Sequence, residues 1–221
     1  MARNAMTDAD KLLRRADFIN AAHHLFREQK ILPSVADIAK SAGLAKGTVY
    51  LYFKTKEEIF IALLEDDFAK LLQKLSIIIQ QLPLNGLKAA EFFAKEYSQL
   101  IKELPDLLPL ASISNGVLEQ NLPIESMVRF KLFLASSLQE FGYLIEQKFS
   151  LKPNEGSGLL LRSYALTLGL WQSLAYPNAL INALSPEIIK ILKRDFNYEL
   201  EQAIYQLWQG CLQPSTMTSL R

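Results

Sequence analysis

The stretch SVADIAKSAGLAKGTVYLYF, residues 34–53, decides how the front of this chain folds. In its first half, apolar residues recur every three or four positions, a spacing that places them on one face of a helix. Ser34 precedes this helix as an N-cap, and Asp37 stands three residues later, as in a capping box. Gly43 follows, and glycine readily takes the left-handed backbone conformation that ends a helix. The pattern predicts a short helix that ends in a tight turn.

A second short helix is expected over residues 45–53. Val49 and Phe53 stand four residues apart and are predicted to face inward. The side chains left for the outer face are Lys46, Thr48, Tyr50 and Tyr52. Two short helices around a glycine turn, the second with lysine and hydroxyl groups outside, are typical of a helix-turn-helix.

Basic residues gather at the same end of the chain. Residues 1–56 hold 10 Lys or Arg against 5 Asp or Glu, whereas residues 57–221 hold 14 against 18, so a net charge of +5 precedes one of −4. A basic region on an acidic remainder suits attraction to nucleic-acid phosphates. Ordinary scatter in composition is the alternative explanation.

Two features bear on the compartment. The single cysteine, Cys211, excludes an intrachain disulfide and fits a reducing cytoplasm, and the first residues lack the apolar run of a secretory signal. Residues 163–186 carry no charge, but Pro177 interrupts them, so a buried helix is favoured over a membrane span. We expect a cytoplasmic protein without a membrane partner, associated with the nucleoid when it is bound to DNA.

The rest of the chain is predicted to be helical. Thr7 and Asp10 suggest a first capping box, followed by an inner stripe that includes Leu12 and Phe26. Thr55 and Glu58 suggest a second capping box at the start of a long helix, which is predicted to end before Pro83. At about 25 residues it is close to 38 Å long, enough to couple two parts of the molecule. Further helices are predicted over residues 86–104, 106–118, 123–149, 155–176 and 186–211, with a frayed tail over 213–221.

The predicted fold class is all-α. An N-terminal three-helix DNA-binding domain with a helix-turn-helix is joined by the long helix to a C-terminal helical bundle that dimerises. The DNA-binding domain is predicted over residues 11–71, and the ligand-binding and dimerisation domain over residues 84–212.

Catalytic signals are weak. His23 and His24 are adjacent, so on a helix they point about 100° apart and do not easily clamp one metal. The chain lacks a glycine-rich phosphate loop, a Gly-x-Ser-x-Gly elbow and a Cys-x-x-Cys pair. We therefore predict no enzymatic activity, no catalytic residue, no metal and no cofactor.

The sequence resembles the tetracycline-repressor (TetR) family of bacterial transcriptional regulators over roughly residues 11–71. The residues that carry the resemblance are Arg15, Ile19, Ala21, Ala22, Leu25, Phe26, Ile38, Ala39, Ala42, Gly43, Leu44, Gly47, Thr48, Val49, Tyr50, Tyr52, Phe53, Lys56 and Glu57. In place of the serine or threonine that is usual in the family, this chain has Ala45, which gives up an N-cap.

The expected DNA contacts follow from position and from the resemblance. Lys46 and Thr48, at the start of the second helix, are placed for base edges or nearby phosphates, and Gly47 lets the backbone come close. The resemblance implies that Tyr50, Tyr52 and Lys56 bind phosphates, and Ser34 is both a cap and a candidate phosphate donor. The alternatives are a Tyr50 ring packed on the first helix, which is compatible with such a contact, and a solvated Lys46.

Dimerisation is expected because one recognition helix reads only a few base pairs. The resemblance also places the dimer interface on the last two long helices. The candidate interface residues are Leu166, Leu170, Leu174, Leu192, Phe196 and Leu200. An intrachain core is the alternative for the same stripes.

Aromatic residues with polar tips in the C-terminal part are candidates for contacting an effector, namely Tyr97, Tyr164 and Trp171. Core packing is the alternative for each of them. Few charges occur in this part, which favours an apolar or amphipathic small molecule.

The sequence thus predicts a dimeric, ligand-responsive transcriptional regulator, most simply a repressor that occupies a palindromic double-stranded DNA operator and is released by a small-molecule effector. The alternative is an architectural or adaptor protein that stays on DNA and holds a protein partner with its helical part. A helical-bundle enzyme is a further alternative, and it requires a metal or a pair of inward carboxylates.

Overall fold

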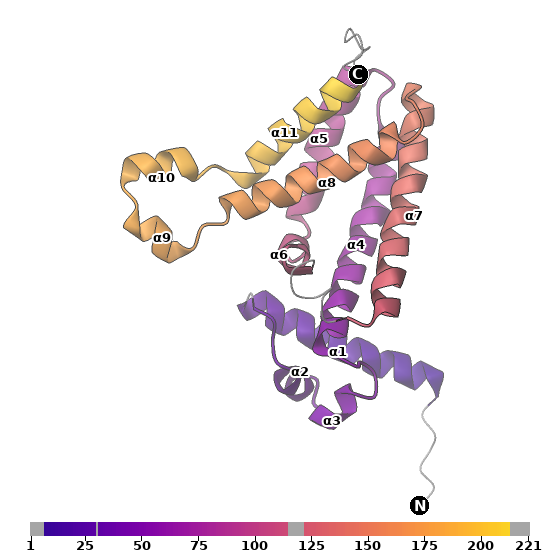
Figure 1. Cartoon of the computed structure of the whole chain (residues 1–221), viewed down its shortest axis with the longest axis vertical. Coiled ribbons are helices and arrows are strands. Elements are labelled where there is room, and N and C mark those ends of the chain that lie inside the picture. Colours follow the sequence, from indigo (N-terminus) through magenta and orange to yellow (C-terminus); the bar gives the residue numbers. More distant parts are fainter. Residues whose placement is uncertain (1–6, 30, 115–121, 213–221) are drawn as a thin grey trace, which may run out of the picture. The chain divides into compact units, whose positions relative to one another are not determined.

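The computed structural model describes residues 7–29, 31–114 and 122–212, and every regular element in these ranges is a helix (Figure 1). The predicted tail over residues 213–221 and the end of the predicted 106–118 helix lie outside them. The helices are α1 (Asp8–Gln29), α2 (Val35–Ser41), α3 (Lys46–Val49), α4 (Lys56–Gln81), α5 (Gly86–Lys102), α6 (Leu107–Ile113), α7 (Ile124–Phe149), α8 (Glu155–Leu174), α9 (Asn178–Ala183), α10 (Pro186–Leu192) and α11 (Phe196–Leu212). The all-α fold class is confirmed.

The chain divides into two compact units. Unit 1 comprises the described residues of Met1–Phe68 and Pro109–Phe130, and unit 2 those of Ala69–Leu108 and Lys131–Arg221. Helix α4 is continuous and contributes its first half to unit 1 and its second half to unit 2. Unit 1 therefore includes a segment from the middle of the sequence in addition to the N-terminal helices.

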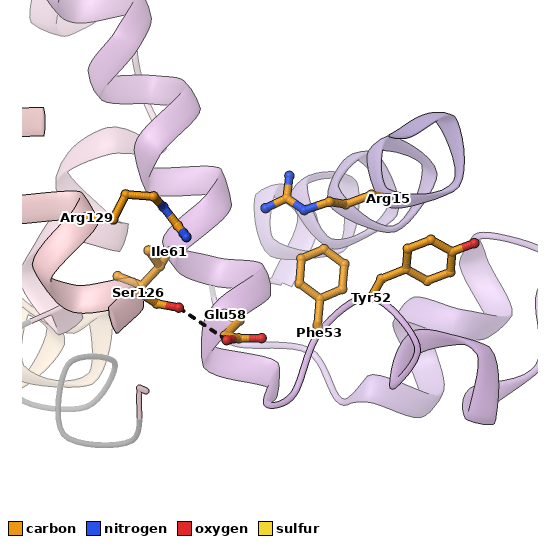
Figure 2. Close-up of a pocket in the computed structure, with 7 residues that line it drawn as sticks. All are labelled: Arg15, Tyr52, Phe53, Glu58, Ile61, Ser126 and Arg129. Atoms are coloured by element: carbon orange, nitrogen blue, oxygen red, sulfur yellow. Dashed lines mark hydrogen bonds between the residues drawn. The ribbon is translucent and has the colours of Figure 1, made fainter. Parts of the chain in front are cut away.

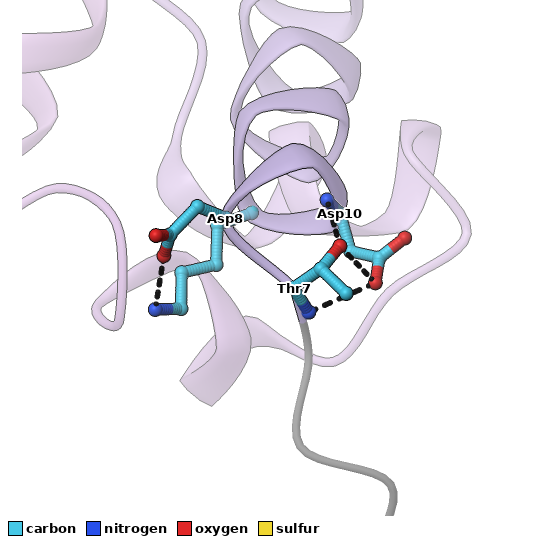
Figure 3. Close-up of polar contacts among 4 residues, drawn as sticks. Thr7, Asp8 and Asp10 are labelled. Carbon is cyan, nitrogen blue, oxygen red and sulfur yellow. Dashed lines mark hydrogen bonds and ion pairs between the residues drawn. The ribbon is translucent and has the colours of Figure 1, made fainter.

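The predicted capping box begins α1 (Figure 3). The Thr7 backbone N–H donates to Asp10 Oδ2 over 3.0 Å, and the Asp10 N–H donates to Thr7 Oγ1 over 3.1 Å. The side-chain hydrogen bond from Thr7 holds the pKa of Asp10 below its ordinary value. Lys11 and Asp8 form an ion pair of 2.9 Å in the same turn. Local chemistry alone thus determines where α1 begins.

The core of unit 1 consists of α1, α2 and the start of α4. Phe18 and Phe26 on α1 are fully or almost fully buried, and the Phe26 ring centroid lies 6.5 Å from that of Phe60 on α4. The predicted inner stripe of α1 is wrong at Leu12, which is 68% exposed, and at Ala16, which is also exposed, whereas its later members Ile19, Ala22 and Phe26 are buried. The stripe begins at Phe18 instead, because α2 and α3 are too short to cover the first turns of a helix of 22 residues.

In unit 2, α11 packs along α5 and against α8. Trp208 and Phe93 are fully buried, and their rings are stacked with centroids 3.6 Å apart. The Tyr97 ring is also stacked with that of Phe93, and their centroids lie 5.3 Å apart. Stacked aromatic rings thus fill the interior between these helices.

Four buried side chains with polar groups form two hydrogen-bonded pairs inside this core. Trp208 Nε1 donates to Ser163 Oγ over 3.0 Å, and the Tyr97 hydroxyl lies 3.1 Å from Thr167 Oγ1. Because the Thr167 hydroxyl already donates to the Ser163 carbonyl over 2.7 Å, Tyr97 is the donor to Thr167. Burial raises the pKa of Tyr97 to about 12, and the hydrogen bond with Thr167 opposes part of that rise. Tyr97 is therefore neutral at physiological pH.

Helices α7 and α8 touch backbone to backbone where they meet. A methyl group added at Gly156 would lie 2.2 Å from the Gly142 carbonyl oxygen, and one added at Gly142 would lie 2.4 Å from the Ser157 nitrogen. Gly156 N–H also donates to Glu146 Oε1 over 3.0 Å. Only glycine permits this approach, which anchors the start of α8 on α7.

The single helix predicted over residues 186–211 is wrong. Residues 193–195 interrupt it, and Asp195 Oδ1 accepts from the Tyr198 N–H over 2.8 Å, so Asp195 starts α11 as a new helix. Helix α9, between Pro177 and Leu184, was not predicted. None of the described helices is long and apolar enough to cross a membrane, and residues 163–186 are divided among α8, α9 and α10.

Candidate nucleic-acid interface

Helix α2 starts with the cap expected from its sequence. Ser34 Oγ accepts from the Asp37 N–H over 3.2 Å and donates to Asp37 Oδ2 over 2.6 Å. Val35, Ile38 and Ala39 are buried. The Ser34 hydroxyl is exposed but its proton is used by Asp37, so donation to a phosphate requires that hydrogen bond to break.

The turn after α2 depends on Gly43, whose φ of +68° lies in the left-handed region. The Leu44 N–H donates to the Ala39 carbonyl over 2.9 Å, and the Gly43 N–H donates to Lys40 over 3.1 Å. These bonds satisfy carbonyl groups at the end of α2 and reverse the chain within three residues.

Helix α3 is shorter than predicted, since it covers Lys46–Val49 and is followed by a turn rather than helix to Phe53. Ala45 makes no side-chain cap, as its sequence implied. Residues 48–53 are mostly β-branched or aromatic, and such residues lose side-chain freedom in a helix. The Phe53 N–H still donates to the Val49 carbonyl over 3.0 Å, and both side chains are buried as predicted.

The outer edge of α3 presents polar groups to solvent. Lys46 and Gly47 are exposed, Thr48 is half-buried, and Tyr50 is 51% exposed. A methyl group added at Gly47 would meet no atom within 4 Å, so nothing in the chain itself requires glycine there. Leu51, which the sequence did not single out, is 81% exposed beside these residues.

The two tyrosines have different surroundings. The Tyr52 ring lies 5.7 Å from Phe18 of α1 and is half-buried, whereas the Tyr50 ring is largely free. Tyr52 thus packs its ring on the first helix, and about half of the Tyr50 side chain stays accessible.

At the start of α4, Thr55 forms the predicted N-cap, and Glu58 returns the bond one residue earlier than a capping box requires, to Lys54 instead of Thr55. The Glu58 N–H donates to Thr55 Oγ1 over 3.3 Å, and the Lys54 N–H donates to Glu58 Oε2 over 2.6 Å. Lys56 is the first residue of α4 and is half-buried. These two bonds order the loop that carries Lys54 and Lys56 next to the helix-turn-helix.

Behind this loop lies a small polar pocket of about 150 Å³, shown in Figure 2. The Arg15 guanidinium carbon lies 5.1 Å from the centroid of the Phe53 ring, a cation–π contact. Ser126 at the start of α7 donates to Glu58 Oε1 over 3.3 Å, and Arg129 pairs with Glu65 at 3.4 Å. The sequence did not suggest that residues 126 and 129 would contact this part of the chain.

The three effector candidates are not equivalent. Tyr97 is buried in the stacked core of unit 2 and its hydroxyl is engaged by Thr167. Tyr164 and Trp171 lie on α8 and are half-buried. An effector that reaches Tyr97 must open this core.

Five of the six interface candidates keep exposed surface. Leu200 is fully buried inside unit 2, so its prediction as an interface residue is corrected to core packing within one chain. The apolar spacing that suggested an interface is equally a core pattern, and α11 uses it to pack on α5. The half-buried candidates are Leu166, Leu170, Leu174, Leu192 and Phe196.

The model for the bacterial regulatory proteins of the tetR family matches residues 18–63, which contain the helix-turn-helix described above. A second model, the tetracyclin repressor-like C-terminal domain, matches residues 65–215. The chain belongs to the tetR family. It is accordingly a DNA-binding regulator of transcription, and its family and structural relatives are regulators rather than enzymes.

One curated relative is the fatty acid metabolism regulator protein of Bacillus subtilis (strain 168). It is 38% identical over 66 residues, which make up 30% of this TetR-family chain and 34% of the relative. The chain thus covers about a third of the length of that relative.

Solved structures share the fold over most of the chain. The fatty acid degradation regulator FadR from Bacillus halodurans has a TM-score of 0.58 at 17% identity, covering 89% of this chain and 94% of that one. FadR from Bacillus subtilis in complex with stearoyl-CoA has a TM-score of 0.54 at 18% identity, covering 90% and 99%. The TetR-family regulator PfmR from Thermus thermophilus has a TM-score of 0.55 at 16% identity, covering 89% and 99%.

Within residues 7–29, 31–114 and 122–212, no group of three or more His, Cys, Asp or Glu side chains is placed to hold a metal ion. His24 lies 3.6 Å from Glu28 on an exposed face of α1.

Proposed function

We propose that this TetR-family regulator is a repressor that binds a palindromic operator as a homodimer and is released by an amphipathic effector. The observation that carries the proposal is the exposed edge of α3, where Lys46, Gly47 and Tyr50 lie at the surface and a methyl group at Gly47 would meet no atom within 4 Å. This edge belongs to the basic end of the chain, which favours contact with phosphates.

The proposed contacts divide into two kinds. Lys46 and Thr48 reach base edges in the major groove, and Gly47 brings the backbone close to the duplex. The remaining residues bind phosphates: Ser34, Tyr50, Tyr52 and Lys56. Among them Tyr50 has the freest side chain, and Ser34 contributes only when its hydroxyl leaves Asp37.

A second copy is required because a single short recognition helix specifies few base pairs. The homodimer is proposed to form through α8 and the region around α11, with Leu166, Leu170, Leu174, Leu192 and Phe196 contributing exposed apolar surface. A two-fold dimer binds a palindrome because its two recognition helices are related by the same symmetry.

The proposed effector is a long-chain acyl thioester. The support is the fold shared with FadR from Bacillus subtilis, which was solved with stearoyl-CoA, together with an apolar interior in unit 2 that has hydroxyl groups at Tyr97 and Thr167. A ligand that binds better to a chain with an opened core shifts the population toward that form. Through the continuous helix α4, that form holds the two recognition helices at a spacing that no longer fits successive major grooves, so operator affinity falls and RNA polymerase gains access.

The test begins with selection of bound fragments from a genomic DNA pool, which yields an operator and its symmetry. Fluorescence anisotropy then measures affinity with added stearoyl-CoA, with free coenzyme A as the matched control. We expect weaker binding with the acyl thioester alone, and Lys46→Ala to weaken operator binding about tenfold without any effector. Affinity that ignores every acyl thioester would favour a DNA-bound adaptor, and failure to recover any DNA would overturn the proposal.

A further inference from the structure

One segment of unit 2 has no buried residue among those whose side chains the structure describes. We call residues 177–195, which contain α9 and α10, the arm. In Figure 1 these two helices stand apart from α5, α8 and α11 of the same unit. Ile191 is 67% exposed, Leu180 44% and Ile188 43%. The arm thus displays aliphatic side chains that its own chain does not cover.

The two helices of the arm are also too short to be stable on their own. Its helices have six and seven residues, whereas isolated helices shorter than about 12 to 15 residues are marginal in water. Exposed apolar surface on such helices indicates an interaction site.

The same unit holds an uncovered groove of matching chemistry at the α7–α8 turn, with a volume of about 380 Å³. Tyr143 is 57% exposed and Leu144 39%, and both line it together with Pro153 and Ser157. Its charged lining residues are Glu140 and Glu146. The arm carries the basic residues Lys190, Lys193 and Arg194 against the acidic residues Glu187 and Asp195, all exposed, so its net charge is +1 and is opposite in sign to that of the groove.

Within one chain these surfaces are far apart. The groove lies at the start of α8 and the arm at its end, and a helix of 20 residues is about 30 Å long. Both ends of the arm are anchored at that far end, and its helices are only about 9 and 10 Å long. With its helices formed, the arm does not reach the groove of its own chain.

A two-fold axis perpendicular to α8 removes this separation, because it places the end of one α8 beside the start of the other. The outer face of α8 suits such pairing: Leu161 is 53% exposed, Ala165 and Gly169 are exposed, and a methyl group at Gly169 would meet no atom within 4 Å. We propose that the arm of each copy docks into the α7–α8 groove of a second copy of this chain, with Ile188 and Ile191 against Tyr143 and Leu144, and Lys190 toward Glu140.

This inference rests on the homodimer proposed above, and sedimentation equilibrium of the full chain at low salt separates the two. Lys190→Glu and Glu140→Lys are each expected to weaken the dimer about tenfold, because each opposes like charges in both symmetric contacts. The double variant restores the opposite pairing and is expected to recover most of that loss. Ile191→Asp is expected to weaken the dimer at least tenfold, whereas Leu84→Asp, at an apolar residue that is 80% exposed outside the arm and groove, leaves it within twofold.

A second measurement does not depend on charge. In a Cys211→Ser background, a chain with Ile188→Cys is mixed with a chain with Tyr143→Cys and treated with a short bis-maleimide, and a heterodimeric product is expected. A wild-type dimer that gives no such product and tolerates Lys190→Glu overturns the arm proposal alone. A wild-type chain that stays monomeric at all concentrations overturns the homodimer and the arm together. Co-flotation with phosphatidylglycerol vesicles that Ile191→Asp abolishes, without crosslinking, would assign the arm to lipid and also overturn it.

Discussion

The two units of this regulator use their residues in opposite ways. Unit 1 exposes the groups proposed to contact DNA, where Lys46, Gly47 and Tyr50 lie at the surface in and just after a short helix and local caps determine the backbone. Unit 2 buries its distinctive groups, with Trp208, Phe93 and Tyr97 stacked and hydrogen-bonded between helices that are distant in sequence. The comparison teaches that the proposed DNA recognition depends on what the fold leaves uncovered, whereas the stability of unit 2 depends on what it encloses.

The largest effect is expected in the enclosed core. Trp208→Ala removes a fully buried, stacked ring and its bond to Ser163, so we expect a loss of about 3 to 5 kcal/mol in the free energy of unfolding. Urea unfolding of the wild type and the variant measures this loss of stability. The matched variant Trp171→Ala, at a half-buried residue, is expected to lose about 1 kcal/mol and to weaken effector response while operator affinity stays near normal. Equal losses for the two tryptophans would break the comparison.

A second test uses alkaline pH. Tyr97 holds its proton to about pH 12 when folded, whereas an exposed tyrosine loses it near pH 10. Between these values the unfolded chain binds fewer protons than the native one, so stability falls as pH rises, by about 2 to 3 kcal/mol in total, and it is unaffected below pH 10.

The measurement compares urea unfolding of the wild type and Tyr97→Phe from pH 9 to 12. Tyr97→Phe lacks this pH-dependent contribution, so its free energy of unfolding is expected to fall less steeply as pH rises. At pH 9 that free energy is expected to be about 1 kcal/mol lower than in the wild type, because a buried hydrogen bond is lost. Parallel curves would show that Tyr97 is not sealed in the core.

In unit 1, the glycines offer a matched pair. Gly43→Ala forces a side chain into a left-handed conformation and is expected to cost about 1 to 2 kcal/mol of stability. Gly47→Ala meets open space, so the free chain is expected to unfold as before while operator affinity falls. Thermal unfolding and anisotropy separate the two effects. Full operator binding by Gly47→Ala would remove this residue from the interface.

The smallest effect concerns single contacts with DNA. Lys46→Ala is expected to weaken operator binding about tenfold and to reduce the salt slope by about 0.9 if it neutralises one phosphate, or to leave the slope unchanged if it reads a base. Tyr50→Phe removes one hydroxyl and is expected to weaken binding less. Lys88→Ala, an exposed lysine of unit 2, serves as the control. Wild-type affinity in Lys46→Ala would place the recognition surface elsewhere.

Helix starts were the most predictable features. Thr7, Ser34 and Thr55 each form the capping interaction that their spacing indicated, because a cap involves only residues three or four positions apart. The buried pair Val49 and Phe53 was predictable for the same reason. In the candidate site, the exposure of Lys46 and the missing cap at Ala45 also followed from the sequence.

Errors arose where packing partners come from distant segments. Leu12 fits the apolar stripe of α1 but extends past the elements that cover it, and Leu200 fits an interface stripe but faces α5. The interruption at residues 193–195 was not predicted, because the apolar spacing continues across it. In the structure, Asp195 caps a new helix at this point. Periodicity reports that a face is apolar, and it does not say what covers that face.

The sequence by itself determined the helical class, the helix-turn-helix and membership of a regulator family, because these follow from spacings within a few turns of helix. Only the tertiary structure decided which tyrosine is free, which leucines are core, and that an apolar arm and an acidic groove lie at opposite ends of α8. The physical reason is that the burial of a side chain depends on its neighbours in space. Tyr52 packs on Phe18, which is 34 positions away along the chain. Leu200 and Trp208 belong to a helix packed on α5, which lies about 100 positions from Leu200 and more than 100 from Trp208.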